Sequence, residues 1–284
     1  MKIGLVLEGG GMRGAFSAGV VNCLLDNNII FNHCYGISSG GLYACLYATN
    51  HYELIKKAAT EIASDKRNVG LYPLLFERQL VAYDLLYDKQ LVENGYHPKQ
   101  LLETNVNVNV GIYDLFQQKS IFINNQVLSN NIAWIKAACA LPIFSRFIKI
   151  DNKLYTDAGI TTMIPVQKAL DDGCEKLLIV TTKDPQFVRK PMKKSSLWIL
   201  KNLIYRKYEQ LNKDLANRHL AYNQQMEQVR NLVTKEIAIN LFPQSDCGVS
   251  RYKGNIDNLT KLYQHGYDTC LESLVKIVDF FQIK

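Results

Sequence analysis

The sequence predicts an α/β protein with a mainly parallel central sheet. Residues 3–7 form a short, nearly continuous apolar run, which is typical of a strand buried on both faces. A glycine loop follows, and apolar residues then recur at helical spacing over 15–25. A second strand at about 33–35 leads into another glycine turn and a helix over 41–49. This βαβα order predicts parallel strands joined by right-handed crossovers.

The composition is that of a globular chain. It has 284 residues, of which 48% are hydrophobic, and 33 Lys and Arg against 26 Asp and Glu give a net charge of +7. Disordered and collagen-like chains are excluded, because the first need low hydrophobicity and the second far more Gly and Pro. The seven cysteines are scattered without a CxxC pair, which favours a reducing compartment over a disulfide framework or a zinc site. We therefore expect no metal and no cofactor.

The N-terminal apolar run ends at Glu8 and is too short for the core of a signal peptide. Nothing in the sequence approaches the 18 or more apolar residues of a membrane span. We expect a cytoplasmic protein, unless it is exported by a route without such a signal.

The later elements follow from the same periodicities. Up to residue 184 we expect a helix at 52–64, an irregular aromatic-rich cap, lid or channel at 68–97, strands at 106–110 and 121–123, a helix at 132–141, a hairpin at 147–155 and a strand at 177–182. From residue 185 the character changes, to a basic stretch, helical patterns over 197–233, one strand at 237–242 and a final helix at 256–281.

The segment Gly36-Ile37-Ser38-Ser39-Gly40 matches G-x-S-x-G at a predicted strand-to-helix turn. Such a turn is so tight that Gly36 and Gly40 can carry no side chain. It points the Ser38 hydroxyl into open space at a helix N-terminus, where backbone N–H groups favour developing negative charge. Without further context, the motif is equally consistent with an ordinary glycine turn.

The loop Gly9-Gly10-Gly11-Met12-Arg13-Gly14 ends the first strand and opens the first helix. Its unpaired N–H groups would suit an oxyanion hole, where a Cβ would obstruct the approach of the substrate oxygen. The loop also fits G-x-G-x-x-G, but the acidic residue that a dinucleotide site needs at the end of the second strand is absent. A P-loop is disfavoured as well, since no Gly-Lys-Ser or Gly-Lys-Thr follows.

A third motif, Asp157-Ala158-Gly159, lies downstream and would be a simple turn if it stood alone. The three motifs in this order, over about residues 3–183, resemble the patatin-like phospholipase family. The resemblance implies a Rossmann-type core in a three-layer α/β/α sandwich and a catalytic domain over 1–184. Residues 185–284 would then be a mainly helical extension with one strand, packed on the core.

The resemblance also implies a Ser–Asp dyad that hydrolyses carboxylic esters of lipids, in the manner of a phospholipase A or lysophospholipase. Ser38 would be the nucleophile and Asp157 would orient or deprotonate it. The oxyanion loop would comprise Gly9, Gly10, Gly11 and Gly14, with Arg13 at the basic position of the family, and the elbow would be completed by Gly36, Ser39 and Gly40. The substrate would be a lipid or another acyl ester, and acyl transfer to an acceptor other than water stays open.

Two departures from the family pattern affect the aspartate loop. Ala158 replaces the usual middle glycine, which matters only if the backbone there needs a positive φ. Thr162-Met163 stands where the family often has a polar pair, so the hydrogen bonding of this loop must differ.

Two other functions stay open. An α/β-hydrolase has the chain order Ser, Asp, His, and His219 or His265 could complete such a triad. A catalytically silent lipid-binding or membrane-binding module is the second.

The positive charge is concentrated in one segment. Residues 185–208 hold seven basic and no acidic residues, so they alone account for the net charge. Within 189–207, aliphatic residues and Trp198 indicate an amphipathic basic helix, which favours an anionic membrane surface. A solvated helix packed on the domain is equally consistent with this pattern. Our hypothesis is peripheral contact with an anionic membrane through residues 189–207, and we expect no nucleic-acid partner.

Overall fold

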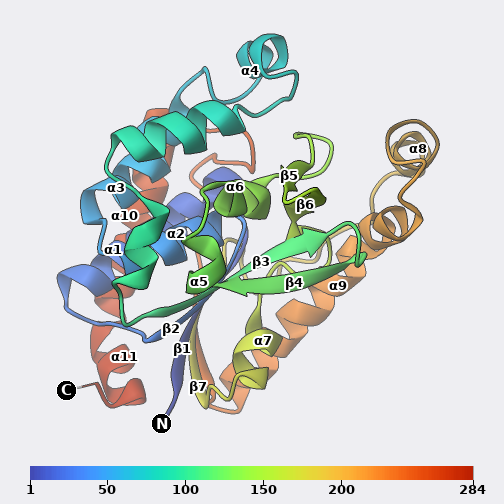
Figure 1. Cartoon of the computed structure of the whole chain (residues 1–284). Helices are drawn as coiled ribbons and strands as arrows, with labels where there is room; N and C mark the ends of the chain where they lie inside the picture. Colours follow the sequence, from blue (N-terminus) through green and yellow to red (C-terminus); the bar gives the residue numbers. More distant parts are fainter. Residues whose placement is uncertain (284) are drawn as a thin grey trace.

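The computed structural model describes residues 1–283 and places eight strands in one sheet (Figure 1). The strand order is β5-β6-β3-β2-β1-β7-β8, and β4 pairs with β3. The strands are β1 (Ile3–Leu7), β2 (His33–Ile37), β3 (Asn107–Asp114), β4 (Lys119–Asn124), β5 (Ile148–Ile150), β6 (Lys153–Asp157), β7 (Lys176–Val180) and β8 (Ala238–Leu241).

The sheet is parallel in its centre and antiparallel at one side. β1 lies between β2 and β7, and both pairs are parallel, as are β2 with β3 and β7 with β8. The pairs β3–β4, β3–β6 and β5–β6 are antiparallel. The carboxyl ends of β1, β2 and β7 therefore meet at one edge, where parallel α/β sheets bind their ligands.

The helices connect these strands and cover both faces of the sheet (Figure 1). They are α1 (Ala15–Asp26), α2 (Ser39–Ala48), α3 (Tyr52–Lys57), α4 (Leu71–Phe76), α5 (Asn125–Leu128), α6 (Ala133–Cys139), α7 (Val166–Asp171), α8 (Lys194–Ile199), α9 (Glu209–Thr234), α10 (Ile256–Glu272) and α11 (Leu274–Phe281). Three further segments are π-helical: Ala58–Ile62, Asp84–Leu91 and Leu200–Ile204. No helix within residues 1–283 is long and apolar enough to span a bilayer.

Alternation along β1 shows how the layers form. Leu5 and Leu7 join the larger core, which the helices α1, α2, α3, α6, α10 and α11 share. Val6 points to the opposite face and packs with residues of α7 and α9. Buried on both faces, the strand can be a continuous apolar run. The predicted three-layer α/β/α architecture is confirmed.

Elements from beyond residue 185 enter all three layers. β8 extends the sheet beside β7, α9 covers one face, and α10 packs against α1 on the other. The contact between α1 and α10 is very close. A Cβ on Gly19 would lie 1.9 Å from the carbonyl oxygen of Tyr263, and one on Gly266 would lie 2.0 Å from that of Phe16. Only glycine permits this separation of the two backbones.

Three helical segments differ from the sequence pattern. The region over 68–97 contains α4 and a π-helix. The pattern over 197–233 is divided into α8, a π-helix and α9, with a break at Tyr205 to Tyr208. The final helix is divided into α10 and α11 at Ser273. In the last two segments the apolar periodicity continues across the break, so periodicity alone does not locate it.

Candidate active site

The turn after β2 holds Ser38 in an uncommon backbone conformation. The φ of Ser38 is 55° and its ψ is −129°, and the residue is only 6% exposed. A Cβ on Gly36 would lie 2.4 Å from the carbonyl oxygen of Gly40, and one on Gly40 would lie 2.5 Å from that of Leu7. Two glycines are therefore required for the turn to close against β1. Ser38 is the N-cap of α2, and its carbonyl accepts the N–H groups of Gly41 and Leu42.

The glycine loop after β1 passes beside this turn, and most of its N–H groups are already bonded. Gly9 donates to the carbonyl of Met163, and Gly10 donates to Ser39 Oγ at 3.1 Å. Met12 donates to the carbonyl of Arg251. Gly11, at φ +59°, has no hydrogen-bond acceptor for its N–H among residues 1–283.

The loop residues differ in what they face. Gly9 and Gly11 line the cavity that contains Ser38. Gly10 lies against Thr182, and Gly14 lies against Ser39 and Tyr43. These two and Arg13 are not among the residues that line the cavity. The structure thus brings Gly9 and Gly11 of the predicted loop to the cavity at Ser38, and it places the other predicted loop residues outside the lining of the cavity.

Asp157 reaches the same place from the end of β6. Its N–H donates to the carbonyl of Ala140, and its Oδ1 accepts the N–H of Gly159 at 2.6 Å. The carboxyl is fully buried, and Oδ2 accepts no hydrogen bond of regular geometry within residues 1–283. Ala158 does not have a positive φ, so the substitution for glycine fits the local backbone.

The loop beyond Asp157 is held by α9, a helix that lies outside the three motifs. Gln225 of α9 accepts the N–H groups of Met163 and Ile164 at 2.8 and 3.0 Å, and donates to the carbonyl of Thr161 at 2.8 Å. Gln225 thereby supplies hydrogen bonds to a loop that lacks the polar pair common in the family. Because Met163 also holds Gly9, the same contacts connect the aspartate loop to the glycine loop.

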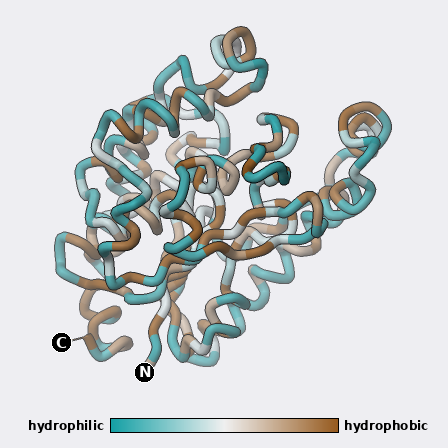
Figure 2. Tube along the Cα trace, viewed as in Figure 1, coloured by the Kyte–Doolittle hydropathy of each residue, from teal (hydrophilic) through white to brown (hydrophobic). Residues whose placement is uncertain are grey.

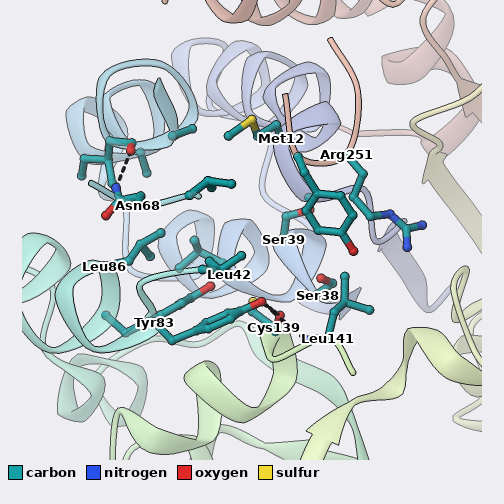
Figure 3. A pocket seen from close by; sticks show the side chains of 18 of the residues that line it. Met12, Ser38, Ser39, Leu42, Asn68, Tyr83, Leu86, Cys139, Leu141 and Arg251 are labelled. Atoms are coloured by element: carbon teal, nitrogen blue, oxygen red, sulfur yellow. Dashed lines mark hydrogen bonds between the residues drawn. The ribbon is translucent and has the colours of Figure 1, made fainter. Parts of the chain in front are cut away.

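Two adjoining cavities meet at Ser38. The smaller is lined by Gly9, Gly11, Ser38, Leu141, Asp157, Gly159, Met163, Arg218 and Arg251. The larger, of about 120 Å³, shares Gly11, Ser38, Leu141 and Arg251 with it and is otherwise mostly apolar (Figure 3). Leu42, Tyr83 and Leu86 are among its walls, and they come from α2 and from the region over 68–97. Cavities of about this size hold apolar groups such as a benzene ring.

Charges around Asp157 act on its protonation. Burial raises the pKa of the carboxyl above its ordinary value. The nearby Ser38 hydroxyl and the N–H of Gly159 oppose this rise in pKa. The positive charges of Arg218 and Arg251 also oppose the rise in the pKa of Asp157. The pKa of Arg218 is itself lowered to about 9, mainly by burial and then by repulsion from Arg251.

The two histidines considered for a triad lie elsewhere. The ring of His265 accepts the N–H of Gln244 and packs on Phe16. The ring of His219 bonds to the carbonyl of Ala216 on its own helix. Neither is among the residues that line the two cavities.

Three site residues, Arg218, Gln225 and Arg251, were missed from the sequence. Each is a single residue without a surrounding motif, on a helix or loop far along the chain from Ser38. The only sequence signal was that the region beyond residue 185 is long enough to cover the sheet.

Comparison with known proteins gives two family matches. Residues 5–170, more than half of the chain, match the model of the patatin-like phospholipases, and residues 208–282 match a domain of unknown function (DUF6363). The uncharacterized protein YjjU of Escherichia coli K12 is 26% identical over 210 residues, which are 70% of this chain and 57% of that protein. The chain thus matches little more than half the length of this relative.

Among solved structures, VipD from Legionella pneumophila has a similar fold. The TM-score is 0.54 at 14% sequence identity, over 97% of this chain and 67% of VipD. The family match, the fold and the order of the three motifs agree with one another. The chain belongs to the patatin-like phospholipase family.

Proposed function

We propose that the chain hydrolyses carboxylic ester bonds of lipids, as a phospholipase A or lysophospholipase does, through Ser38 and Asp157. Membership of the family indicates a lipid acyl hydrolase. One observation carries the finer assignment. Ser38 and Asp157, which come from distant motifs, line a single small cavity together with Gly11. This cavity adjoins the larger apolar cavity at Ser38.

In the first step, Ser38 Oγ bonds to the ester carbonyl carbon and its proton passes to Asp157 Oδ2. Oδ1 is held by the N–H of Gly159, so Oδ2 is the oxygen available as a base. A raised pKa brings the carboxylate closer to the proton affinity that the step needs. Catalytic hydrogen bonds are often incomplete without substrate. This accounts for the absence of a regular hydrogen bond between the Ser38 hydroxyl and Asp157 Oδ2.

The negative charge on the carbonyl oxygen needs backbone donors. Gly9 and Gly10 donate to other groups, so we assign the oxyanion hole to the N–H groups of Gly11 and Ser39. Ser39 is the first residue of α2, and its N–H has no partner within the helix. Losing one such donor typically lowers kcat by roughly 10² to 10³.

The intermediate then collapses. Asp157 returns the proton to the leaving alcohol, and the acyl group stays bonded to Ser38 Oγ. A water molecule gives a proton to Asp157 and bonds to the acyl carbon, and the fatty acid leaves as Ser38 recovers its proton. The apolar cavity would hold the acyl chain during both steps.

The two other functions have less support. A Ser–Asp–His mechanism would require His219 or His265 at the cavity, and both are bonded elsewhere. A silent binding module would not need a strained serine beside a buried carboxyl.

The test is hydrolysis of a panel of defined lipids together with labelling by a fluorophosphonate probe. Ser38→Ala and Asp157→Asn should each lower hydrolysis by about a thousandfold or more, and Ser38→Ala should not be labelled. Asp151→Asn, on the exposed turn between β5 and β6, is the matched control and should leave both readouts unchanged. If Asp157→Asn keeps its activity while His219→Ala or His265→Ala loses it, the dyad assignment is wrong.

We also propose that this enzyme docks on an anionic membrane. Two helical protrusions, α4 and α8 with its π-helical continuation, carry exposed apolar residues (Figure 2). Phe76 is 71% exposed and Leu203 is 68% exposed. The loop 143–146 is bonded to the chain just beyond each protrusion. Phe144 accepts the N–H of Leu80, which follows α4, and Ile143 donates to the hydroxyl of Tyr205, which follows the π-helix.

The charge of residues 189–207 fits the same surface, since basic residues beside an apolar face attract anionic lipid at about 1 kcal/mol each. Reversal of Lys193, Lys194 and Lys201 to Glu should weaken binding to phosphatidylserine vesicles by about a hundredfold or more. Binding to neutral phosphatidylcholine vesicles is the control. Equal binding of wild type and variant to the anionic vesicles would contradict docking through this segment.

A further inference from the structure

Four arginines gather beside the proposed site, and none of them forms an ion pair within residues 1–283. They come from four separate parts of the chain. These are Arg13 in the glycine loop, Arg189 after β7, Arg218 on α9 and Arg251 before α10. An arginine without a partner usually remains at the surface, where water solvates its charge. The convergence of four arginines in one place therefore points to another role.

Arg218 and Arg251 are the two members that line the small cavity with Ser38 and Asp157. Arg218 is held in place, since its Nε donates to the carbonyl of Gly159. Figure 3 shows the guanidinium of Arg251 on one side of Ser38 and the apolar cavity, with Leu42 and Asn68, on the other. Ser38 therefore lies between an apolar compartment and a cationic one.

The other two members, Arg189 and Arg13, are not among the residues that line the two cavities. The Arg189 guanidinium stacks on the ring of Tyr222, 4.3 Å from the ring centroid. Arg13 is 7% exposed, and its Nε has no hydrogen-bond partner among the described residues. The nearby carboxylate of Glu8 is fully buried and bonded to the N–H of Thr182.

The arginines repel one another. Burial lowers the pKa of Arg13 and of Arg189, and the charge of Arg251 is the next cause in both cases. The same two causes lower the pKa of Arg218. Two carboxylates, Glu8 and Asp157, stand against four guanidinium groups, and burial raises the pKa of both. The cluster therefore favours a bound anion of more than one charge.

We propose that Arg218 and Arg251 bind the phosphate of a phosphomonoester lipid, an acylglycerol phosphate, while its acyl chain fills the apolar cavity. This inference rests on the proposed function and specifies its substrate. Both residues lie in the region that matches the domain of unknown function, so that region would set the head-group specificity.

The chemistry of the substrate matches the order of the compartments. In an acylglycerol phosphate, the ester carbonyl stands between the acyl chain and the phosphate, as Ser38 stands between the apolar walls of the larger cavity and the guanidinium of Arg251. Guanidinium groups bind phosphate oxygens through paired, charge-assisted hydrogen bonds. A phosphate that carries a choline would present one negative charge fewer and a cation, and a monoacylglycerol would present no charge.

The test compares three substrates with the same acyl chain, kept short enough to stay monomeric: acylglycerol 3-phosphate, acylglycerophosphocholine and monoacylglycerol. Monomeric substrates remove any contribution from membrane docking. We expect wild type to have a kcat/KM at least about tenfold higher for the phosphomonoester than for the monoacylglycerol. Equal values for the two substrates in wild type would overturn the proposal.

Arg251→Gln should lower the phosphomonoester-to-monoacylglycerol ratio of kcat/KM by about 10-fold to 100-fold, as expected for loss of a charged hydrogen bond. The ratio is used because the charge of Arg251 also acts on Asp157, and that effect is common to all substrates. Arg251→Lys should keep more of the ratio than Arg251→Gln. Lys253→Gln removes an exposed positive charge two residues away and is the matched control.

Two outcomes separate this proposal from the proposed function. If Arg251→Gln keeps the wild-type ratio while Ser38→Ala abolishes monoacylglycerol hydrolysis, the dyad stands and the phosphate site is wrong. Inorganic phosphate serves as a separate probe. If it alters monoacylglycerol hydrolysis although wild type shows no preference for the phosphomonoester, the cluster binds free phosphate and the head-group assignment is overturned.

Discussion

The two regions of the chain contribute to the site in different ways. Residues 1–184 supply Ser38, Asp157 and the glycine loop, which are placed by tight turns at the ends of strands. Residues 185–283 supply Arg218, Gln225 and Arg251, which act mainly through long side chains. A turn constrains the residues around it and leaves a motif, whereas a long side chain leaves no pattern in its neighbours. We retain the division at residue 184 as a proposal on this basis.

The first prediction tests whether the two regions can be separated energetically. Gly19→Ala would place a Cβ 1.9 Å from the carbonyl oxygen of Tyr263, so α1 and α10 would have to move apart. We expect the free energy of unfolding to fall by about 3 kcal/mol, with one cooperative transition in urea. Gly254→Ala, whose Cβ would meet only side chains, those of Leu259 at 3.2 Å and Val249 at 3.5 Å, is the control. Loss of hydrogen-exchange protection confined to residues 185–283 would show that the regions unfold separately.

A second prediction concerns the contact of α9 with the aspartate loop. Gln225→Ala leaves the N–H groups of Met163 and Ile164 without their acceptor. We expect kcat to fall about tenfold with little change in KM, because the loop that positions Asp157 and Gly9 loosens while the apolar cavity is untouched. Gln224→Ala, on the exposed face of the same helix, should have neither effect. A change in KM alone would place Gln225 in substrate binding instead.

The third prediction is the pH dependence of stability. Because burial raises the folded-state pKa of Asp157, its contribution to stability is full below the unfolded pKa of about 3.8 and is lost as pH rises through the folded pKa. Asn is neutral at every pH, so Asp157→Asn should unfold at a higher urea concentration than wild type at about pH 8. The difference should shrink toward about pH 4. The opposite trend would mean that the Asp157 carboxylate stabilises the fold.

The smallest effect is expected at the departure from the family motif. Ala158 lacks a positive φ, so Ala158→Gly should change the free energy of unfolding by less than about 1 kcal/mol. The value of kcat/KM should stay within about twofold of wild type. A large gain in activity would show that the alanine restricts the aspartate loop during turnover.

The sequence allowed much of the architecture to be predicted. The order strand, glycine loop and helix predicted β1 and α1, and the alternation of valines with polar residues predicted β3. The turn around Ser38 and the loop around Asp157 were predictable as local structure, because glycine and small residues are needed there. Their catalytic roles stay predictions until the variants are assayed.

Other features could not be predicted because they depend on packing between distant elements. The close approach of α1 and α10 at Gly19 and Gly266 depends on two glycines that appear unremarkable in helices. The cluster around Arg251 depends on four chain segments that converge in space. The break at Ser273 likewise leaves no trace in the apolar pattern.

The pairing of α10 with α1 also has a consequence for how the chain folds during synthesis. β1 pairs with β7, which is made much later, and α1 packs against α10, which is made later still. Contacts of such long sequence separation form late. We expect the nascent chain to lack a closed site until α10 has left the ribosome, so that the proposed hydrolysis cannot begin before this helix is made. Protease protection of stalled nascent chains, measured before and after α10 emerges, would reveal this delay.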